Sequence, residues 1–170
     1  MRIELPRLLT IPIAAAGLVA FFCAVPGPVA LGDNSLPLPR FVSLKSAEVN
    51  LRTGPGTRYP IDWVYQRRAL PVEIIAEFDI WRRVRDSEGT VGWIHRALLS
   101  GRRSALVTPP ERVFRRAPDT GAPAIFRAAS GVLVHIISCD GEWCHVAHGD
   151  TKAWTKQSGL WGVYPGELID

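Results

Sequence analysis

The chain has three cysteines, and Cys139 and Cys144 are the two that lie outside its apolar N-terminal run. They flank Asp140-Gly141, a dipeptide typical of a tight hairpin turn. In an oxidising compartment, an even pair of cysteines across a turn favours a disulfide. Because the closed loop is short, the expected stabilisation is modest, about 2 kcal/mol. We predict a disulfide between Cys139 and Cys144.

Two histidines beside this pair leave a metal site as the alternative, with thiolate and imidazole ligands from Cys139, Cys144, His145 and His148. Adjacent Cys144 and His145 point to opposite faces of a strand, so both cannot easily reach one ion. A nucleophile built from Cys144, His148 and Asp150 is a further alternative. A domain of about sixty residues, however, has little room for the cleft that a cysteine hydrolase needs. We expect no catalysis, no metal and no cofactor.

A tryptophan beside arginines offers the best candidate for ligand binding. Strand alternation places Trp81, Arg83 and Arg85 on one accessible face, while Val84 turns inward. Such a face suits an extended peptide or a sugar that carries carboxylates. The alternative is that Trp81 packs against a neighbouring domain, and Trp143 has the same alternative.

Arginine dominates the basic side chains of this chain, whose formal net charge is +4. Arginine favours planar, bidentate contact with carboxylate or phosphate, so a polyanion or a peptide carboxylate is an expected partner. The alternative is an ordinary solvated surface. The arginines recur as doublets at Arg67-Arg68, Arg82-Arg83, Arg102-Arg103 and Arg115-Arg116.

The predicted strands that carry these residues form an internal repeat. The two copies correspond through 72–84 with 134–146, 92–94 with 153–155, and Val49–Arg52 with Val113–Arg116. Each copy reads as short strands rich in Val, Ile and Trp between Gly, Pro and Asp turns. Such a unit is expected to close as a small antiparallel barrel, because closure removes exposed sheet edges. We predict strands near 43–52, 62–66, 69–78, 81–86 and 90–94, and near 105–116, 124–128, 131–139, 143–147 and 152–155.

The segment Val49-Asn50-Leu51-Arg52-Thr53-Gly54-Pro55-Gly56-Thr57 resembles the N-terminal signature of bacterial SH3-like domains. Trp81…Val84 and Gly92-Trp93-Ile94 resemble later landmarks of that family, and the agreement spans residues 42–99. The resemblance implies an all-β fold of two tandem SH3-like barrels. In it, Trp93 is expected to seal the barrel after Gly92, where the missing side chain lets the backbone pass close to a neighbour. The second copy is degenerate, with Ala153 in place of the glycine.

The chain after its leader also resembles a group of alphaproteobacterial secreted proteins with tandem SH3-like domains. In that group the second copy carries a Cys-x4-Cys pair, and the end reads like the segment from Trp161 to Glu167. The resemblance implies no catalytic activity.

The N-terminus reads as an export signal. Arg2 and Arg7 precede an almost purely apolar run over 8–25, and Ala30-Leu31-Gly32 fits a cleavage site. Phe22 before Cys23 does not fit a lipoprotein signal. An uncleaved anchor is the alternative, since the run approaches the length that spans a bilayer.

These observations predict a periplasmic or secreted protein without a membrane span once the leader is removed. The expected function is non-catalytic binding in the cell envelope, to peptidoglycan stem peptides or to an extended segment of an envelope protein. The alternative is a structural or scaffolding role in a periplasmic complex. Nucleic acid is not expected as a partner, because export removes it. The predicted organisation is a signal peptide at 1–32, a linker at 33–41, SH3-like domains at 42–101 and 102–164, and a tail at 165–170.

Overall fold

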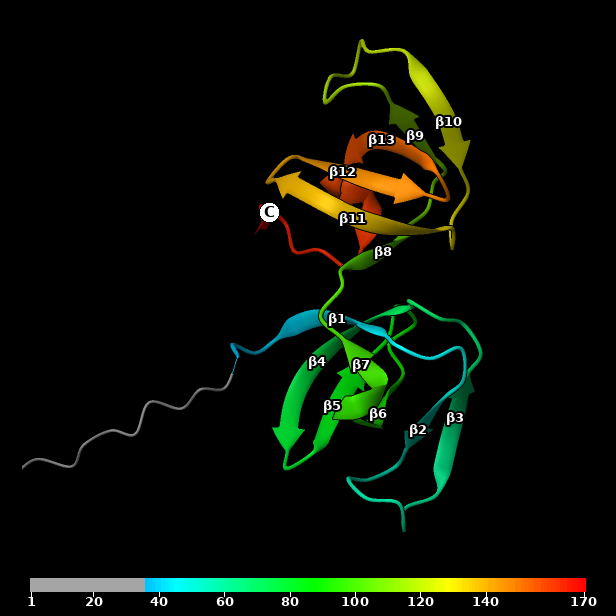
Figure 1. Cartoon of the computed structure of the whole chain (residues 1–170), viewed down its shortest axis with the longest axis vertical. Coiled ribbons are helices and arrows are strands. Elements are labelled where there is room, and N and C mark those ends of the chain that lie inside the picture. The colour runs from blue at the N-terminus through cyan, green and yellow to red at the C-terminus, as the bar shows by residue number, and fades with distance from the viewer. Residues whose placement is uncertain (1–35) are drawn as a thin grey trace, which may run out of the picture. The chain divides into compact units, whose positions relative to one another are not determined.

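The structure, a computed structural model, describes residues 36–170. The predicted signal peptide and its cleavage site lie outside these residues. The described part of the chain forms two antiparallel sheets and two short 3-10 helices, and each sheet curls around its own core (Figure 1). Within residues 36–170, no helix has the length and apolar character needed to cross a membrane.

The first sheet, which we call the first barrel, has seven strands in the order β3-β2-β6-β5-β4-β1-β7. The 3-10 helix η1, Arg96–Leu98, joins β6 to β7. The strands are β1 (Arg40–Leu44), β2 (Val49–Arg52), β3 (Ile61–Tyr65), β4 (Pro71–Phe78), β5 (Trp81–Arg85), β6 (Val91–His95) and β7 (Leu99–Ser100).

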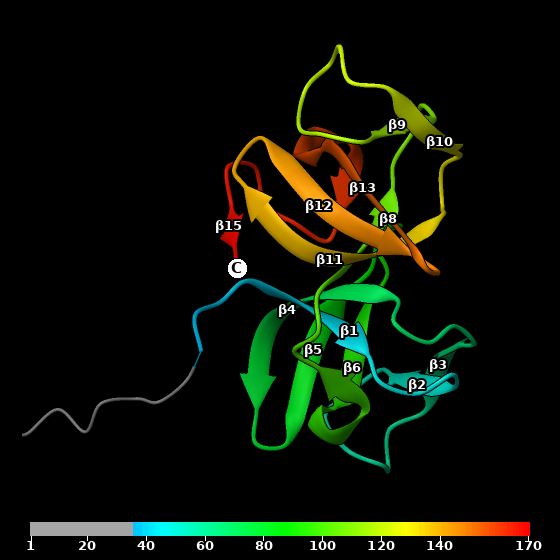
Figure 2. The same ribbon diagram turned by 45° about the horizontal axis from the view of Figure 1, so that its top comes forward.

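The second sheet, the second barrel, repeats this order as β10-β9-β13-β12-β11-β8-β14, with β15 added beside β11 (Figure 2). The 3-10 helix η2, Gln157–Gly159, takes the place of η1. The strands are β8 (Ser104–Val107), β9 (Arg112–Arg115), β10 (Ala124–Ala128), β11 (Leu133–Asp140), β12 (Trp143–His148), β13 (Thr151–Lys156), β14 (Leu160–Trp161) and β15 (Leu168–Ile169).

Alternating apolar residues build one core in each barrel, as the sequence pattern predicts. In the first barrel, Leu51, Val84 and Ile94 are fully buried. A side chain at Gly92 would begin 2.5 Å from Leu51, so the backbone can pass there only without a Cβ. In the second barrel, the fully buried Phe114 stacks on Phe126 with ring centroids 4.5 Å apart.

The predicted fold class is confirmed, but the strand boundaries and the closure of the sheets differ from the prediction. The strands expected over 43–52 and 105–116 are each divided by a turn, into β1 and β2 and into β8 and β9. Each sheet also remains an open path of strands, and β3 and β10 each lie at one end of it. At the other ends lie β7 and β14, so the described strands leave two end strands in each sheet, and the expectation that closure removes the edges was wrong.

The segment after β13 links the second barrel to the first. The Tyr164 hydroxyl donates a 2.9 Å hydrogen bond to Glu73 on β4. The ring of Phe41 on β1 lies 5.1 Å from that of Trp161 and 4.8 Å from that of Tyr164. Residues 36–170 accordingly form one compact unit.

Candidate functional site

The three predicted ligand-binding residues lie on one face of β5, as alternation requires, but they differ in exposure. Arg83 and Arg85 are exposed, whereas Trp81 retains only 8% of its accessible surface. Its indole is covered by His95, which is paired with it from β6 and whose ring lies edge-on at 5.4 Å. The expected accessible position of Trp81 was therefore wrong.

Arg85 is held in an ion pair. Its Nε and Nη2 donate to Oε2 of Glu73 at 2.9 and 2.5 Å, and the Glu73 side chain is only 4% exposed. The Tyr164 hydroxyl donates to the other oxygen of the same carboxylate. Burial, together with this hydrogen bond to Glu73, raises the pKa of Tyr164 far above its ordinary value, so the hydroxyl remains a donor. Arg85 is thus paired with Glu73, the residue that Tyr164 of the second barrel contacts.

Trp93 is the tryptophan that lies beside a free arginine. It is half-buried on the same face of the sheet as Arg83, its direct partner across β5 and β6, and Arg52 on β2 is paired with it on the other side. Gly92 and Ile94 occupy the inner face, so Trp93 does not seal the barrel as expected. We call the set Arg83, Trp93 and Arg52 the first-barrel row.

The two cations of the first-barrel row have different tasks. Arg52 donates from Nη1 to the carbonyl oxygens of Tyr59 at 2.8 Å and Thr57 at 3.2 Å, which fixes the loop 53–60 beside the row. A Cβ at Gly54 would lie 2.4 Å from the Tyr59 ring, so this loop depends on the glycine. Arg83 is exposed and forms no ion pair within residues 36–170. Arg83 is therefore available to a ligand.

The second barrel repeats this arrangement with His145, Trp154 and Arg115, the second-barrel row. Arg115 donates from Nη1 to the carbonyl oxygen of Ala122 at 2.6 Å, seven residues along the chain, as Arg52 does to Tyr59. The His145 ring, however, stacks on Trp154 with centroids 4.7 Å apart and planes within 10°. One face of this indole is thus already covered.

The structure also corrects the register of the repeat. Arg52 pairs with Trp93 and Arg115 pairs with Trp154, so Arg52 is equivalent to Arg115 and not to Arg116. The expected alignment upstream of the loop was wrong by one residue. The correspondence of Trp93 with Trp154 was visible in the sequence. Neighbouring residues of a strand point to opposite faces, so the position of Trp93 directly after the inward-facing Gly92 was the sign that these tryptophans face outward.

Cys139 and Cys144 are joined by a disulfide across the hairpin of β11 and β12, with an S–S distance of 1.99 Å. Nδ1 of His148 lies 3.0 Å from the carbonyl oxygen of Leu133, away from this pair. In the part of the chain that the structure describes, no three His, Cys, Asp or Glu side chains group as metal ligands would. The disulfide therefore stabilises the β11–β12 hairpin.

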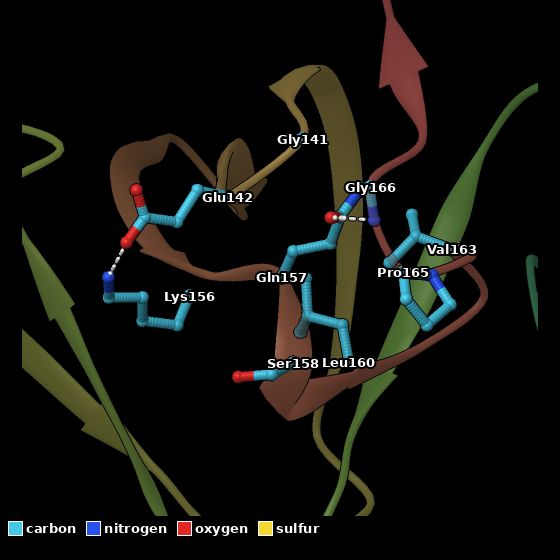
Figure 3. Close-up of a pocket in the computed structure, with 9 residues that line it drawn as sticks. All are labelled: Gly141, Glu142, Lys156, Gln157, Ser158, Leu160, Val163, Pro165 and Gly166. Atoms are coloured by element: carbon cyan, nitrogen blue, oxygen red, sulfur yellow. Dashed lines mark hydrogen bonds and ion pairs between the residues drawn. The ribbon is translucent and has the colours of Figure 1, made fainter.

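A cavity of about 590 Å³ opens on the second barrel between the β11–β12 hairpin and the C-terminal segment (Figure 3). Glu142 and Lys156 form an ion pair on one side, and the buried Gln157 accepts a 3.0 Å hydrogen bond from the amide of Gly166 on the other. Lys156 also lies over the Trp143 ring, 4.4 Å from its centroid. Because these polar groups are already bonded to one another, the cavity offers a ligand fewer free partners than the first-barrel row.

The bacterial SH3 domain family matches residues 45–101 and 108–162, one match in each barrel. Domains of this family typically serve as binding modules. No match is found among curated proteins.

Two solved structures with weak similarity are NlpC2 from Trichomonas vaginalis and an NlpC/P60 family protein from Bacillus cereus ATCC 10987. The first is 15% identical with a TM-score of 0.34, and the match covers 75% of this chain and 49% of that one. The second is 13% identical with a TM-score of 0.33, covering 71% and 55%. This chain thus spans about half the length of these two proteins. Since a family match covers each barrel, the chain belongs to the bacterial SH3 domain family, with two copies of the domain.

Proposed function

We propose that this chain is a non-catalytic binding module of the cell envelope that recognises the stem peptides of peptidoglycan. The observation that carries the proposal is the first-barrel row, in which the half-buried Trp93 lies between Arg83 and Arg52. A similar tryptophan-centred arrangement occurs in the second barrel.

The row fits a peptide that carries carboxylates. The flat, apolar indole of Trp93 offers contact area at low entropic cost, and the free guanidinium of Arg83 can bind a carboxylate with two parallel hydrogen bonds. Arg52 keeps the loop 53–60 in place beside the indole. An extended peptide could therefore lie across β5, β6 and β2 with its acidic groups toward Arg83.

Export to the envelope is part of the proposal. The charged start, the apolar run and the small residues at Ala30-Leu31-Gly32 support a cleaved leader. The Cys139–Cys144 disulfide is consistent with an oxidising compartment, where such links persist. N-terminal sequencing of the protein from a periplasmic extract tests this part, and a chain that still begins at Met1 in the membrane fraction would contradict cleavage.

Co-sedimentation with purified peptidoglycan tests the binding proposal. We expect the protein to pellet with peptidoglycan, and Trp93→Ala to weaken binding by about 2 kcal/mol or more, as loss of a tryptophan anchor does. Trp63→Ala, which removes a 57% exposed tryptophan outside the row, is the matched control and should bind normally. Equal binding by Trp93→Ala and the unmodified protein would refute the role of the row.

A scaffolding role is a second candidate, favoured by the edge strand β3. Ile61 and Trp63 on this strand are 47% and 57% exposed, and among the strands of residues 36–170 only β2 pairs with β3. An unpaired edge with exposed apolar side chains can accept a strand from a partner protein. Pull-down from an envelope extract distinguishes the two roles. Retention of a single protein that is lost in Trp63→Ala and kept in Trp93→Ala would favour the scaffold.

A further inference from the structure

In two of the arginine doublets, one arginine forms a hydrogen bond within the fold and the other lines a cavity. In Arg67-Arg68, Arg67 donates from Nη1 to the carbonyl oxygen of Gly131 at 2.9 Å. In the second, Arg103 donates to both carboxylate oxygens of Glu167, at 2.7 and 2.9 Å. The other members, Arg68 and Arg102, are exposed and line one cavity. Each doublet therefore contributes one arginine to structure and one to this cavity.

The cavity has a volume of about 300 Å³ and a strongly basic lining. Lys45 and His135 line it together with the two arginines, and Ser43 and Ser100 are polar residues of the same lining. No Asp or Glu is among its lining residues, and its lysine and arginines form no ion pair with any residue of 36–170. Lys45, Arg68 and Arg102 thus bring three positively charged side chains to the lining of one cavity, and no carboxylate of residues 36–170 pairs with them.

The backbone that presents Arg68 is held in an uncommon conformation. Ala69, next to it in the lining, has a φ of 60°, in the left-handed region that residues other than glycine seldom adopt. Its amide donates to the carbonyl oxygen of Leu44 at 2.9 Å, and its carbonyl oxygen accepts from the Ser104 hydroxyl at 2.6 Å. Strained conformations that neighbours enforce in this way cluster at binding sites.

We propose that this cavity binds a phosphate group. Guanidinium groups match phosphate oxygens with paired hydrogen bonds, and lysine binds phosphate as a point charge. A phosphate monoester carries a charge of about −1.5 to −2 near neutral pH, so it balances this lining better than a single carboxylate does. The site shares no residue with the first-barrel row, and it stands or falls independently of peptide binding.

Titration of the purified protein with inorganic phosphate tests the site, with chloride used to keep the ionic strength constant. Phosphate should raise the melting temperature, because it binds only the folded state. Arg68→Gln combined with Arg102→Gln should weaken phosphate binding by about tenfold for each arginine removed. Since both side chains are exposed, the melting temperature without phosphate should not change.

The matched control is Arg96→Gln combined with Arg116→Gln, which removes the same charge from two exposed arginines outside the cavity. This variant should bind phosphate as the unmodified protein does. Equal weakening in both double variants would reduce the effect to net charge and overturn the site. Absence of any phosphate-specific stabilisation in the unmodified protein would overturn it as well.

Two further probes identify the source of the phosphate. Binding of glycerol 3-phosphate that depends on Arg68 and Arg102 would assign the site to a soluble phosphate monoester. Arginine-dependent binding to vesicles of phosphatidylcholine with phosphatidic acid, whose headgroup is also a phosphate monoester, but not to phosphatidylcholine alone, would assign it to a lipid headgroup. Failure of both probes, with inorganic phosphate also inactive, would leave the cavity without this function.

Discussion

In the first barrel, Trp93 has the free guanidinium of Arg83 as its neighbour, whereas in the second barrel the equivalent Trp154 is covered by the ring of His145, 4.7 Å away. The strands around the two tryptophans follow the same order. One framework can therefore carry an open tryptophan–cation surface in one copy and a closed one in the other. We expect the first barrel to be the principal binding copy.

The second barrel has structural features that the first barrel lacks. Its hairpin is closed by the Cys139–Cys144 disulfide, and β15 pairs with the cysteine-bearing strand β11. Its C-terminal segment brings Tyr164 to Glu73 in the first barrel. We expect the second barrel to act chiefly as the structural partner of the first.

The largest loss of stability is expected from substitution of the two equivalent buried tryptophans, one in each barrel. Trp81 and Trp143 are 8% and 6% exposed. Truncation of either to alanine should cost about 3 to 5 kcal/mol of unfolding free energy, since a large buried side chain is lost. Denaturant unfolding measures this cost. The folded fraction of Trp81→Ala should still bind peptidoglycan, and a folded Trp81→Ala protein without binding would return Trp81 to the site.

A smaller effect separates the barrels at one backbone position. Gly92→Ala should destabilise the protein by about 1 to 3 kcal/mol, because the new Cβ would begin 2.5 Å from the buried Leu51. The second barrel already has a buried alanine, Ala153, at the equivalent place. Denaturant unfolding of Gly92→Ala and of Ala153→Gly, measured side by side, shows whether the two cores differ at this position. A neutral Gly92→Ala would show that the first core has more room than the geometry indicates.

Removal of the disulfide should cost about 2 kcal/mol, since the closed loop is short. Replacement of Cys139 and Cys144 by alanine should lower the melting temperature and leave binding at the first-barrel row unchanged. Intact mass before and after reduction checks that the link is present. Loss of peptidoglycan binding in the folded variant would contradict a purely structural second barrel.

The smallest effect concerns pH. Burial of Glu167 opposes its charge, but hydrogen bonds from Arg103 and from the Tyr164 amide, together with the Arg103 charge, outweigh it and keep the pKa below the ordinary value of 4.5. Because the folded-state pKa is lowered, its contribution is present above pH 4.5 and is lost as the pH falls through the folded value. The pair is partly exposed, so we expect less than about 1 kcal/mol. Glu167→Gln should reduce the acid sensitivity of the melting temperature, and an unchanged profile would contradict the assignment.

Strand alternation and the repeated tryptophans were enough to predict an all-β fold of two small barrels, and the resemblance of residues 49–57 and 92–94 to a known family predicted that the barrels are SH3-like. Alternation also placed Trp81 and Arg83 on one face of β5, but it could not show that His95 covers the indole, because that contact comes from another strand. The partner of Arg85 was likewise hidden. A register shift between Ile74 and Ala76 sets which residues of β4 face β5, and no local pattern in the sequence marks it.

The two-residue strands also could not be predicted from the sequence. β7, β14 and β15 have two residues each, too few for a periodic pattern, and they form only because a longer strand is already in place beside them. The first-barrel row escaped prediction for a related reason. Its members lie on β5, β6 and β2, so only the sheet order brings them together.

The indole N–H resonances of the six tryptophans report directly on peptide binding at the first-barrel row, because all six lie in the described residues and occupy different surroundings. A soluble peptidoglycan stem peptide is titrated into nitrogen-15-labelled protein, and single tryptophan substitutions assign the signals. We expect the largest shift at Trp93, a smaller one at Trp154, and none at the buried Trp81 and Trp143. An unchanged Trp93 signal, with shifts confined to Trp63 or with no shifts at all, would contradict the central claim that the first-barrel row binds the peptide.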